Sequence, residues 1–167
     1  MPTILFSHGK HSHPQSTKIN YLAAIAQELG YTTHSIDYTN TLDPEKRVEI
    51  LRAQIALQEK APSILVGSSM GAYVAAVMAS EIPVQGLFLM APAFYLNGYT
   101  QQCFQPQCTN IEIVHGWQDE VVPYQGSIEF GQKHGARLHL LQGNHRLSEN
   151  QAFLQETFCS FLKRILI

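Results

Sequence analysis

The chain has 167 residues, 45% of them hydrophobic and 14% charged, which is typical of one compact globular domain (residues 1–167) and excludes a disordered or fibrous chain. Its net charge of −2 provides no basic surface, so we expect no nucleic-acid partner. Three cysteines argue against a disulfide framework and no apolar run is long enough to cross a membrane, so we expect a cytoplasmic protein without a membrane partner.

Short apolar runs alternate with stretches of helical period along the whole chain. In chain order the first expected elements are the strand Thr3–Ser7, the helix Ser16–Leu29, the strand Thr32–Ile36, a helix from Pro44 to about Lys60, the strand Ser63–Gly67 and the helix Met70–Ser80. The strands Val84–Met90 and Ile111–His115, the helix Tyr124–His134, the strand Arg137–Leu141 and a helix to about Arg164 follow. Ser148 and Gln151 have the spacing of a capping box at the start of that last helix.

This alternation predicts an α/β fold in which helices cover both faces of a doubly wound parallel sheet. We expect six parallel strands in the order 2-1-3-4-5-6, with the switch point between the first and third strands. The loop His8–Pro14 and the loop after the third strand are then expected to meet at that crevice. Only Ala91–Asn110 lacks a period, and this stretch is too short for a separate cap domain.

The stretch Gly67-Ser68-Ser69-Met70-Gly71 joins an apolar strand to an apolar helix. A Gly-x-Ser-x-Gly pattern in this context predicts a nucleophile elbow with Ser69 at its apex. The two glycines lack a Cβ, so the end of the strand and the first helical turn can approach closely. The alternative is a plain helix start in which Ser68 or Ser69 is the N-cap.

A serine nucleophile needs a base, which is normally a histidine held by a carboxylate. Among eight histidines, His145 is the one in the loop between the last strand and the last helix, at the catalytic edge of the sheet. The loop after the preceding strand offers Asp119, which we favour, and Glu120 as a second choice. The alternative for either is a solvated turn residue. The order Ser69, Asp119, His145 is that of α/β-hydrolases.

Acyl transfer also needs two donors for the tetrahedral oxyanion. We expect these to be the backbone N–H groups of Met70 and of Lys10, which follows Gly9 in the loop after the first strand. Three histidines of that loop raise the alternative of a metal site, but their spacing matches no ligand pattern, so we predict no metal. These histidines are His8, His11 and His13.

Several motifs together carry a family resemblance. They are Phe6-Ser7-His8-Gly9, Pro14-Gln15-Ser16-Thr17-Lys18, Gly67-Ser68-Ser69-Met70-Gly71, His115-Gly116-x-x-Asp119-x-x-Val122-Pro123 and Gly143-Asn144-His145-Arg146. With these motifs the chain resembles the α/β-hydrolase superfamily, and in particular its small, lidless bacterial esterase-like members. The resemblance implies a minimal form of that fold, without the N-terminal antiparallel hairpin and without a cap domain.

We therefore expect a serine hydrolase that cleaves a small carboxylic ester or thioester through an acyl-enzyme on Ser69, with no cofactor. A crevice without a cap domain buries few methylenes, so we expect a preference for short acyl chains. The residues expected to contact the substrate are His11, Trp117 and Phe94. Two alternatives stay open: a peptidase or carbon–carbon hydrolase with the same triad, and a binding or signalling protein with little turnover.

Overall fold

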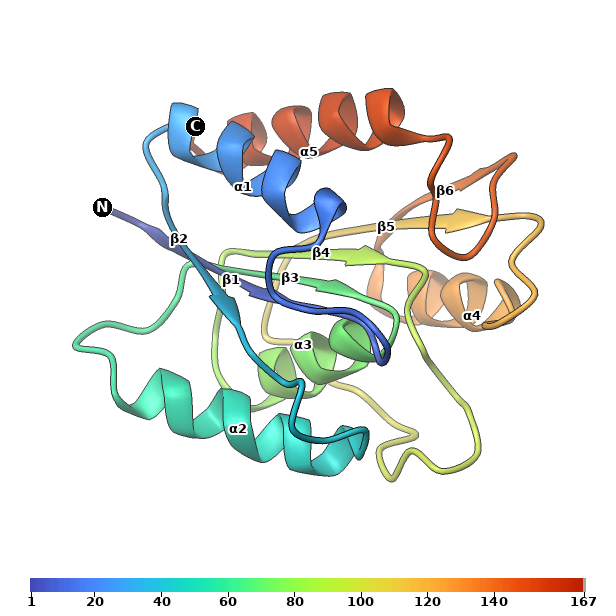
Figure 1. Ribbon diagram of the computed structural model, residues 1–167, viewed down its shortest axis with the longest axis horizontal. Coiled ribbons are helices and arrows are strands. Elements are labelled where there is room, and N and C mark those ends of the chain that lie inside the picture. Colours follow the sequence, from blue (N-terminus) through green and yellow to red (C-terminus); the bar gives the residue numbers. More distant parts are fainter. Residues whose placement is uncertain (167) are drawn as a thin grey trace.

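A computed structural model describes residues 1–166 of the chain (Figure 1). Six strands form one sheet in the order β2-β1-β3-β4-β5-β6, and all neighbouring strands are parallel, which confirms the predicted fold class. In chain order the elements are β1 (Thr3–Ser7), α1 (Thr17–Glu28), β2 (Thr32–Ile36), α2 (Pro44–Ala56), β3 (Ile64–Ser68), α3 (Met70–Glu81), β4 (Gly86–Met90), β5 (Asn110–Gly116), α4 (Gln125–His134), β6 (Arg137–Leu141) and α5 (Gln151–Leu166).

Helices cover both faces of the sheet, which is why its central strands are apolar throughout instead of alternating. Along β1, Ile4 and Phe6 belong to the core beneath α1 and α5, whereas Leu5 belongs to the core on the opposite face, with α2, α3 and α4. Helix α3 lies between the sheet and α2, so all its residues from Met70 to Ala79 are buried. The nucleophile elbow therefore leads into a helix that is buried from Met70 to Ala79.

The start of the last helix differs from the prediction. Ser148 does not cap α5, which begins at Gln151. The side chain of Asn144 holds Ser148 instead, through a 3.1 Å hydrogen bond from Asn144 Nδ2 to Ser148 Oγ. Asn150 directly precedes the helix, and its carbonyl accepts the Leu154 N–H at 2.9 Å. The predicted capping box is wrong because Gln151 is the first residue of the helix, so it is too close to the helix start to be the third residue after a cap.

The end of α2 also differs from the prediction. The helix ends at Ala56 and not near Lys60. Pro62 follows shortly after, and a proline disfavours helical backbone in the residue before it. The remaining predicted boundaries agree with the structure to within two residues.

Residues 91–109 connect β4 to β5 without a helix or strand, yet they are firmly attached to the rest of the protein. The Glu45 carboxylate on α2 accepts hydrogen bonds from the Tyr73 hydroxyl at 2.7 Å and from the Thr100 N–H at 3.1 Å. The rings of Phe94 and Phe104 are buried against each other. The segment therefore forms a packed wall beside the elbow.

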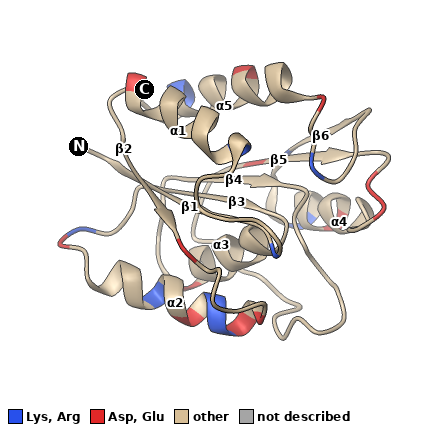
Figure 2. Cartoon of the chain, viewed as in Figure 1, with Lys and Arg blue, Asp and Glu red and all other residues tan. Residues whose placement is uncertain are grey.

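Charged side chains lie mainly on helices and loops (Figure 2). Glu112 of β5 is a buried exception, and it pairs with His139 at 2.7 Å and with Arg164. None of the described helices is long and apolar enough to cross a membrane.

Candidate active site

Ser69 lies at the sharp turn between β3 and α3. Its backbone has φ 56° and ψ −117°, a conformation that is costly for a non-glycine residue and that the surrounding structure imposes. A Cβ on Gly67 would overlap the backbone of Gly71, and a Cβ on Gly71 would overlap the backbone of Ser7. Only glycine fits at either position, so the Gly-x-Ser-x-Gly pattern is a steric requirement of this turn.

The structure brings Ser69, His145 and Asp119 together. His145 Nε2 lies 3.0 Å from Ser69 Oγ, and His145 Nδ1 lies 2.7 Å from Asp119 Oδ2. His145 comes from the loop between β6 and α5, and Asp119 from the loop after β5. Glu120, the second choice for the acid, is exposed, whereas the Asp119 side chain is fully buried. The serine, the imidazole and the carboxylate form one hydrogen-bonded chain.

Four hydrogen bonds hold the Asp119 carboxylate. Its Oδ1 accepts the N–H groups of Val121 and Val122, both at 2.8 Å, and its Oδ2 accepts from His145 and His115. Burial by itself raises the pKa of Asp119, but the bonds from Val122, His145 and Val121 outweigh burial and lower this pKa. The carboxylate is therefore ionised while it orients His145.

His115 also contacts the Asp119 carboxylate, although the sequence assigns it no role in the site beyond its place at the end of a strand and in the motif shared with the family. Its side chain is fully buried, and Nε2 lies 3.0 Å from Asp119 Oδ2 and 3.1 Å from the Val122 carbonyl. Two oxygen acceptors fix the proton on Nε2, so Nδ1 accepts the Ser127 hydroxyl at 2.7 Å. Burial lowers the pKa of His115, which keeps the ring neutral. The signals in the sequence are its place at the end of a strand, four residues before Asp119, and its presence in the motif His115-Gly116-x-x-Asp119.

The loop after β1 passes directly beside Ser69. A Cβ on Gly9 would lie 3.6 Å from Ser69 Cβ, so this loop borders the elbow as expected. In the described part of the chain, neither the Met70 N–H nor the Lys10 N–H donates a hydrogen bond to another protein group. Both predicted oxyanion donors therefore keep an unused N–H next to the elbow.

A buried arginine holds this loop in place. Arg47 of α2 is fully buried, and it donates four hydrogen bonds to backbone carbonyls. One bond goes to Thr41 at 2.9 Å and three go to the carbonyls of residues 8–10 at 3.0–3.3 Å. Its guanidinium also lies over the Tyr38 ring, 5.5 Å from the centroid. No carboxylate pairs with Arg47 among residues 1–166.

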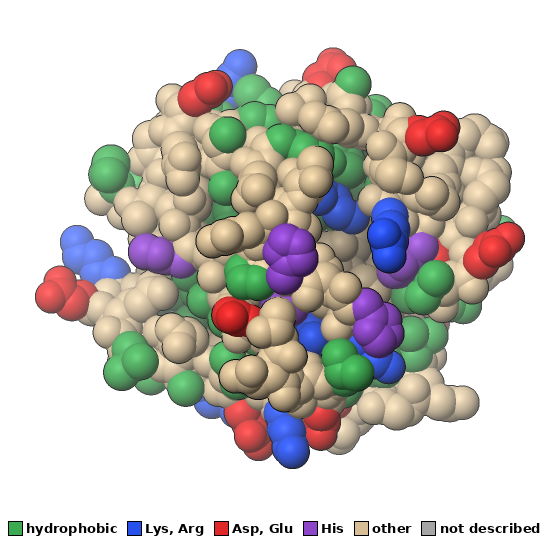
Figure 3. Space-filling view, in the orientation of Figure 1, with side chains coloured by type: hydrophobic (Ala, Val, Ile, Leu, Met, Phe, Trp, Pro, Cys, Tyr) green, Lys and Arg blue, Asp and Glu red, His purple; other side chains and the backbone are tan. Residues whose placement is uncertain are grey.

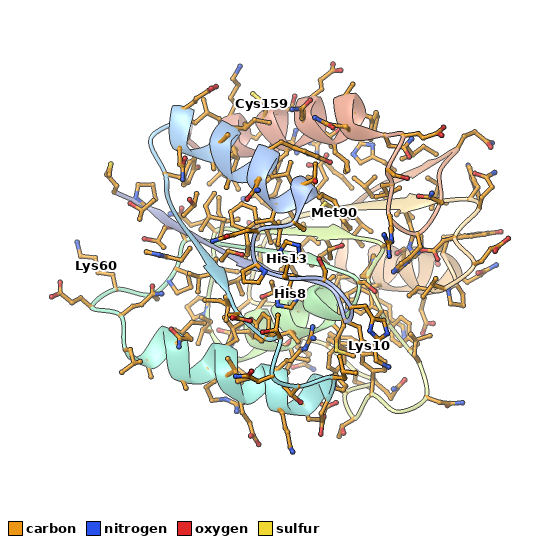
Figure 4. The ribbon with its side chains drawn as sticks, viewed as in Figure 1. His8, Lys10, His13, Lys60, Met90 and Cys159 are labelled. Atoms are coloured by element: carbon orange, nitrogen blue, oxygen red, sulfur yellow. The ribbon has the colours of Figure 1, made fainter. Side chains whose placement is uncertain are left out.

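His8 fixes the same loop from the other side. Its Nδ1 lies 2.8 Å from the Gly9 carbonyl, and its Nε2 accepts the Tyr38 N–H at 3.0 Å. Both ring nitrogens are thus used within the fold, and burial lowers the pKa of His8. Figure 4 shows His8, Lys10 and His13 following the chain from β1 toward α1.

Ser69 and His145 open into a cavity of about 900 Å³. His11 lines it as predicted, together with Leu96, Tyr99 and Val121. Figure 3 shows histidine and cationic side chains gathered around a hollow on this face.

Two residues expected to contact the substrate do not line this cavity. Phe94 is buried and stacks on Phe130 in the core, with ring centroids 4.3 Å apart. Trp117 is 43% exposed and packs edge-on against Tyr124. An aromatic residue in a loop has the same sequence signal whether it packs the loop down or faces a ligand, so the sequence alone does not separate the two roles.

The sheet order and the elbow define the protein as an α/β hydrolase, and the comparisons with known proteins agree. Within that superfamily the chain belongs to the uncharacterised protein family UPF0227, whose family model matches residues 3–106. A protein of Xanthomonas campestris pv. campestris assigned to the same superfamily is 31% identical, with a TM-score of 0.87 over 98% of this chain and 99% of that one.

Two more distant structures share the fold. A lidless serine hydrolase from Xanthomonas campestris is 19% identical, with a TM-score of 0.81 over 97% of this chain and 81% of that one. Est1E from Butyrivibrio proteoclasticus, with ferulic acid bound, is 18% identical, with a TM-score of 0.78 over 99% of this chain and 90% of that one. The comparison with curated proteins gave no match.

Proposed function

We propose that the protein is a cytoplasmic serine hydrolase that cleaves small carboxylic esters or thioesters through an acyl-enzyme on Ser69. The observation that carries this proposal is the hydrogen-bonded chain Ser69–His145–Asp119, which opens into a cavity beside two unused backbone N–H groups. Nucleophile, base, orienting carboxylate and oxyanion donors are the four parts that acyl transfer needs. The lidless serine hydrolase of the same fold supports the reaction class by analogy only.

In the first half of the reaction, Ser69 Oγ attacks the carbonyl carbon while His145 Nε2 takes the hydroxyl proton. Asp119 holds the proton on Nδ1, so Nε2 is the free basic nitrogen. The N–H groups of Met70 and Lys10 then bind the oxyanion. When the tetrahedral intermediate collapses, the leaving alcohol or thiol takes the proton from His145.

In the second half, His145 accepts a proton from water, and the resulting hydroxide attacks the acyl-enzyme. The carboxylic acid leaves, and the proton on His145 returns to Ser69. Every proton that His145 takes is returned within the cycle, so the reaction needs no cofactor.

The test of this assignment is covalent labelling by a fluorophosphonate, which reacts with an activated serine. We expect the wild-type protein to be labelled on Ser69 and the Ser69→Ala variant not to be labelled. Ser68→Ala is the matched control, because Ser68 also borders the cavity but makes no hydrogen bond to His145 in the described structure. Labelling that persists in Ser69→Ala, or equal loss in both variants, would overturn the proposal.

A series of 4-nitrophenyl esters tests the substrate class. We expect kcat/KM to rise over the shortest acyl chains and to level off or fall toward palmitate, since residues 91–109 form no cap domain over the cavity and a methylene contributes its about 0.8 kcal/mol only where it is buried. A clear optimum at the longest chains would contradict a preference for small acyl groups.

A further inference from the structure

One wall of the cavity beside His145 is cationic. We call it the cationic wall, and it consists of Lys10, Lys18 and Arg146. His11 and His13 line the same cavity. In the described structure, no aspartate or glutamate is among the residues that line this cavity. Positive groups therefore line the space that the substrate enters, and the carboxylate that acts on Lys18, Asp119, is buried behind His145 and does not line it.

Three other cationic side chains in the described part of the chain have carboxylate partners. Arg52 pairs with Glu81 at 2.6 Å, Lys133 pairs with Glu129 at 2.7 Å, and Arg164 pairs with Glu112. None of the three residues of the cationic wall forms such a pair in the described part of the chain. Among residues 1–166, Lys46 and Lys60, outside the cavity, also have no such partner, so the distinguishing feature of the three wall residues is that they line one cavity.

Lys18 is the central residue of this wall. Its side chain is partly buried, and its one hydrogen bond runs from Nζ to the Arg146 carbonyl at 3.0 Å. An ammonium has three donors, so two are left for a ligand. Burial and the nearby charge of Arg146 lower the pKa of Lys18 to about 8, although the Asp119 carboxylate acts in the opposite direction. An anion in the cavity would attract the ammonium and raise this pKa again, which favours the charged form further.

Helix α1 adds to the positive field at the same place. Ser16 caps this helix by accepting the Ile19 N–H, and Ser16, Thr17 and Lys18 of its first turn all line the cavity. The N-terminal end of a 12-residue helix carries a partial positive charge and favours a nearby anion. The helix end and the lysine ammonium therefore point to the same ligand charge from two independent sources.

We propose that the cationic wall binds a carboxylate or phosphate group carried by the ester substrate. The inference rests on the proposed hydrolase function, because it describes the substrate of that same site. Lys18 bonds the carbonyl of the residue directly after His145, so the anionic group sits near the reacting carbonyl. The substrate is then a small anionic ester in which a few bonds separate the charge from the scissile bond.

Matched ester pairs test this proposal. The first pair differs on the leaving group, which is anionic in 3-acetoxybenzoate and neutral in methyl 3-acetoxybenzoate. The second pair differs on the acyl group, which is anionic in mono-4-nitrophenyl adipate and neutral in its methyl ester. 3-Acetoxyphenyl phosphate provides the phosphate arm. We expect the wild-type protein to prefer at least one anionic ester over its neutral partner by about tenfold in kcat/KM. The compound that shows the preference tells whether the site binds a carboxylate or a phosphate, and on which side of the ester the charged group lies.

The variants separate the cationic wall from a general effect of charge. We expect Lys18→Met to reduce the ratio of anionic to neutral kcat/KM about tenfold, whereas Lys46→Met on α2, outside the cavity, leaves this ratio unchanged. A wild-type protein without any anion preference, or a preference that survives in Lys18→Met, would overturn the proposal.

A binding measurement makes the test independent of turnover. We expect benzoate or inorganic phosphate to raise the Tm of the wild-type protein and of Lys46→Met, and to have less effect on Lys18→Met. If none of the esters is cleaved while this difference in Tm is present, the hydrolase assignment fails and the anion site stands. If the esters are cleaved without an anion preference and without a difference in Tm, the anion site fails and the hydrolase stands.

Discussion

Two buried charges of opposite sign support the proposed active site, and the protein stabilises them differently. Asp119 is held by two imidazole rings and two backbone N–H groups, whereas Arg47 is held by four backbone carbonyls. Neither forms a pair with a fixed charge of opposite sign in the described structure. In both cases hydrogen bonds replace the water that burial removes.

The difference between the two supports follows from what each one holds. Asp119 holds His145, whose charge changes as a proton moves, so a carboxylate that stabilises the cationic ring is useful there. Arg47 holds the loop at residues 8–10, which has only to keep a backbone N–H in position. A planar guanidinium with five fixed donors suits that task, because it can bind several carbonyls at once.

The largest expected effect comes from replacing the Asp119 carboxylate that orients His145. Asp119→Asn keeps the size of the side chain but favours the wrong tautomer of His145, so we expect kcat to fall by about 10⁴. Steady-state kinetics with a short 4-nitrophenyl ester measure this loss. Glu120→Gln is the matched control, since Glu120 is exposed, and we expect less than a twofold change. Equal losses in the two variants would contradict the role of Asp119.

Removing the hydrogen bonds from Arg47 to the loop at residues 8–10 has the next largest expected effect. Arg47→Met leaves the carbonyls of residues 8–10 without their donor, and the Lys10 N–H moves away from the oxyanion. We expect kcat to fall by about 10²–10³, the cost of one oxyanion donor, while KM changes little.

Two comparisons show whether Arg47 positions the loop or only stabilises the fold. Arg47→Lys provides one ammonium for several carbonyls, so we expect it to restore only part of kcat. In Arg47→Ala, we expect millimolar guanidinium to recover activity without changing that of the wild-type protein. Losses in kcat that follow the fraction of unfolded protein, without rescue, would make Arg47 a purely structural residue.

Replacing His115 tests the hydrogen bond that this residue donates to the Asp119 carboxylate. In His115→Leu, Asp119 loses one hydrogen bond and binds the His145 imidazolium more strongly. We therefore expect about a tenfold loss of kcat and a shift of the acidic limb of the kcat/KM profile to higher pH. Ser127→Ala acts on His115 alone, so we expect a smaller shift in the same direction. An unchanged pH profile in His115→Leu would exclude this coupling.

The smallest expected effect is on stability at mildly acid pH. Burial lowers the pKa of His8 and His115 in the folded protein, so below about pH 6.5 the unfolded chain binds protons that the folded chain does not. The free energy of unfolding therefore decreases as the pH is lowered, by up to about 1.4 kcal/mol per pH unit for each histidine. The lowered pKa of Asp119 adds a further loss below about pH 4.

Urea titrations at pH 7.5 and pH 5.5 measure this dependence. We expect His115→Leu to show a weaker pH dependence than the wild-type protein, and exposed His34→Gln to match the wild type. A free energy of unfolding that is the same at both pH values would contradict the buried neutral histidines.

The sequence located the parts of the site that follow strands, but not those that support them. Ser69, Asp119 and His145 follow strands that the sequence predicts, and the parallel fold brings the ends of these strands to one edge. Arg47 stands in a charged helical turn after Glu45 and Lys46, which is typical of a solvated surface. Its position four residues before the buried Leu51 was the signal that it faces inward.

Contacts between distant elements account for the rest. Whether Phe94 faces a ligand or the core depends on Phe130 of α4, which sequence periodicity cannot relate to it. Likewise, His115 belongs to the site only because the Asp119 side chain turns back toward the strand it follows. Local patterns predict where the chain turns, and tertiary packing decides which side chains meet.

The central claim is that Ser69 carries the acyl group during turnover, and trapping that intermediate tests it most directly. 4-Nitrophenyl trimethylacetate has a hindered acyl group that slows the attack of water on an acyl-enzyme. We expect a burst of 4-nitrophenol equal to the protein concentration, and, after an acid quench, one trimethylacetyl group on the peptide that contains Ser69 by mass spectrometry. Turnover without an acyl group on that peptide, or with the acyl group on another residue, would contradict the account.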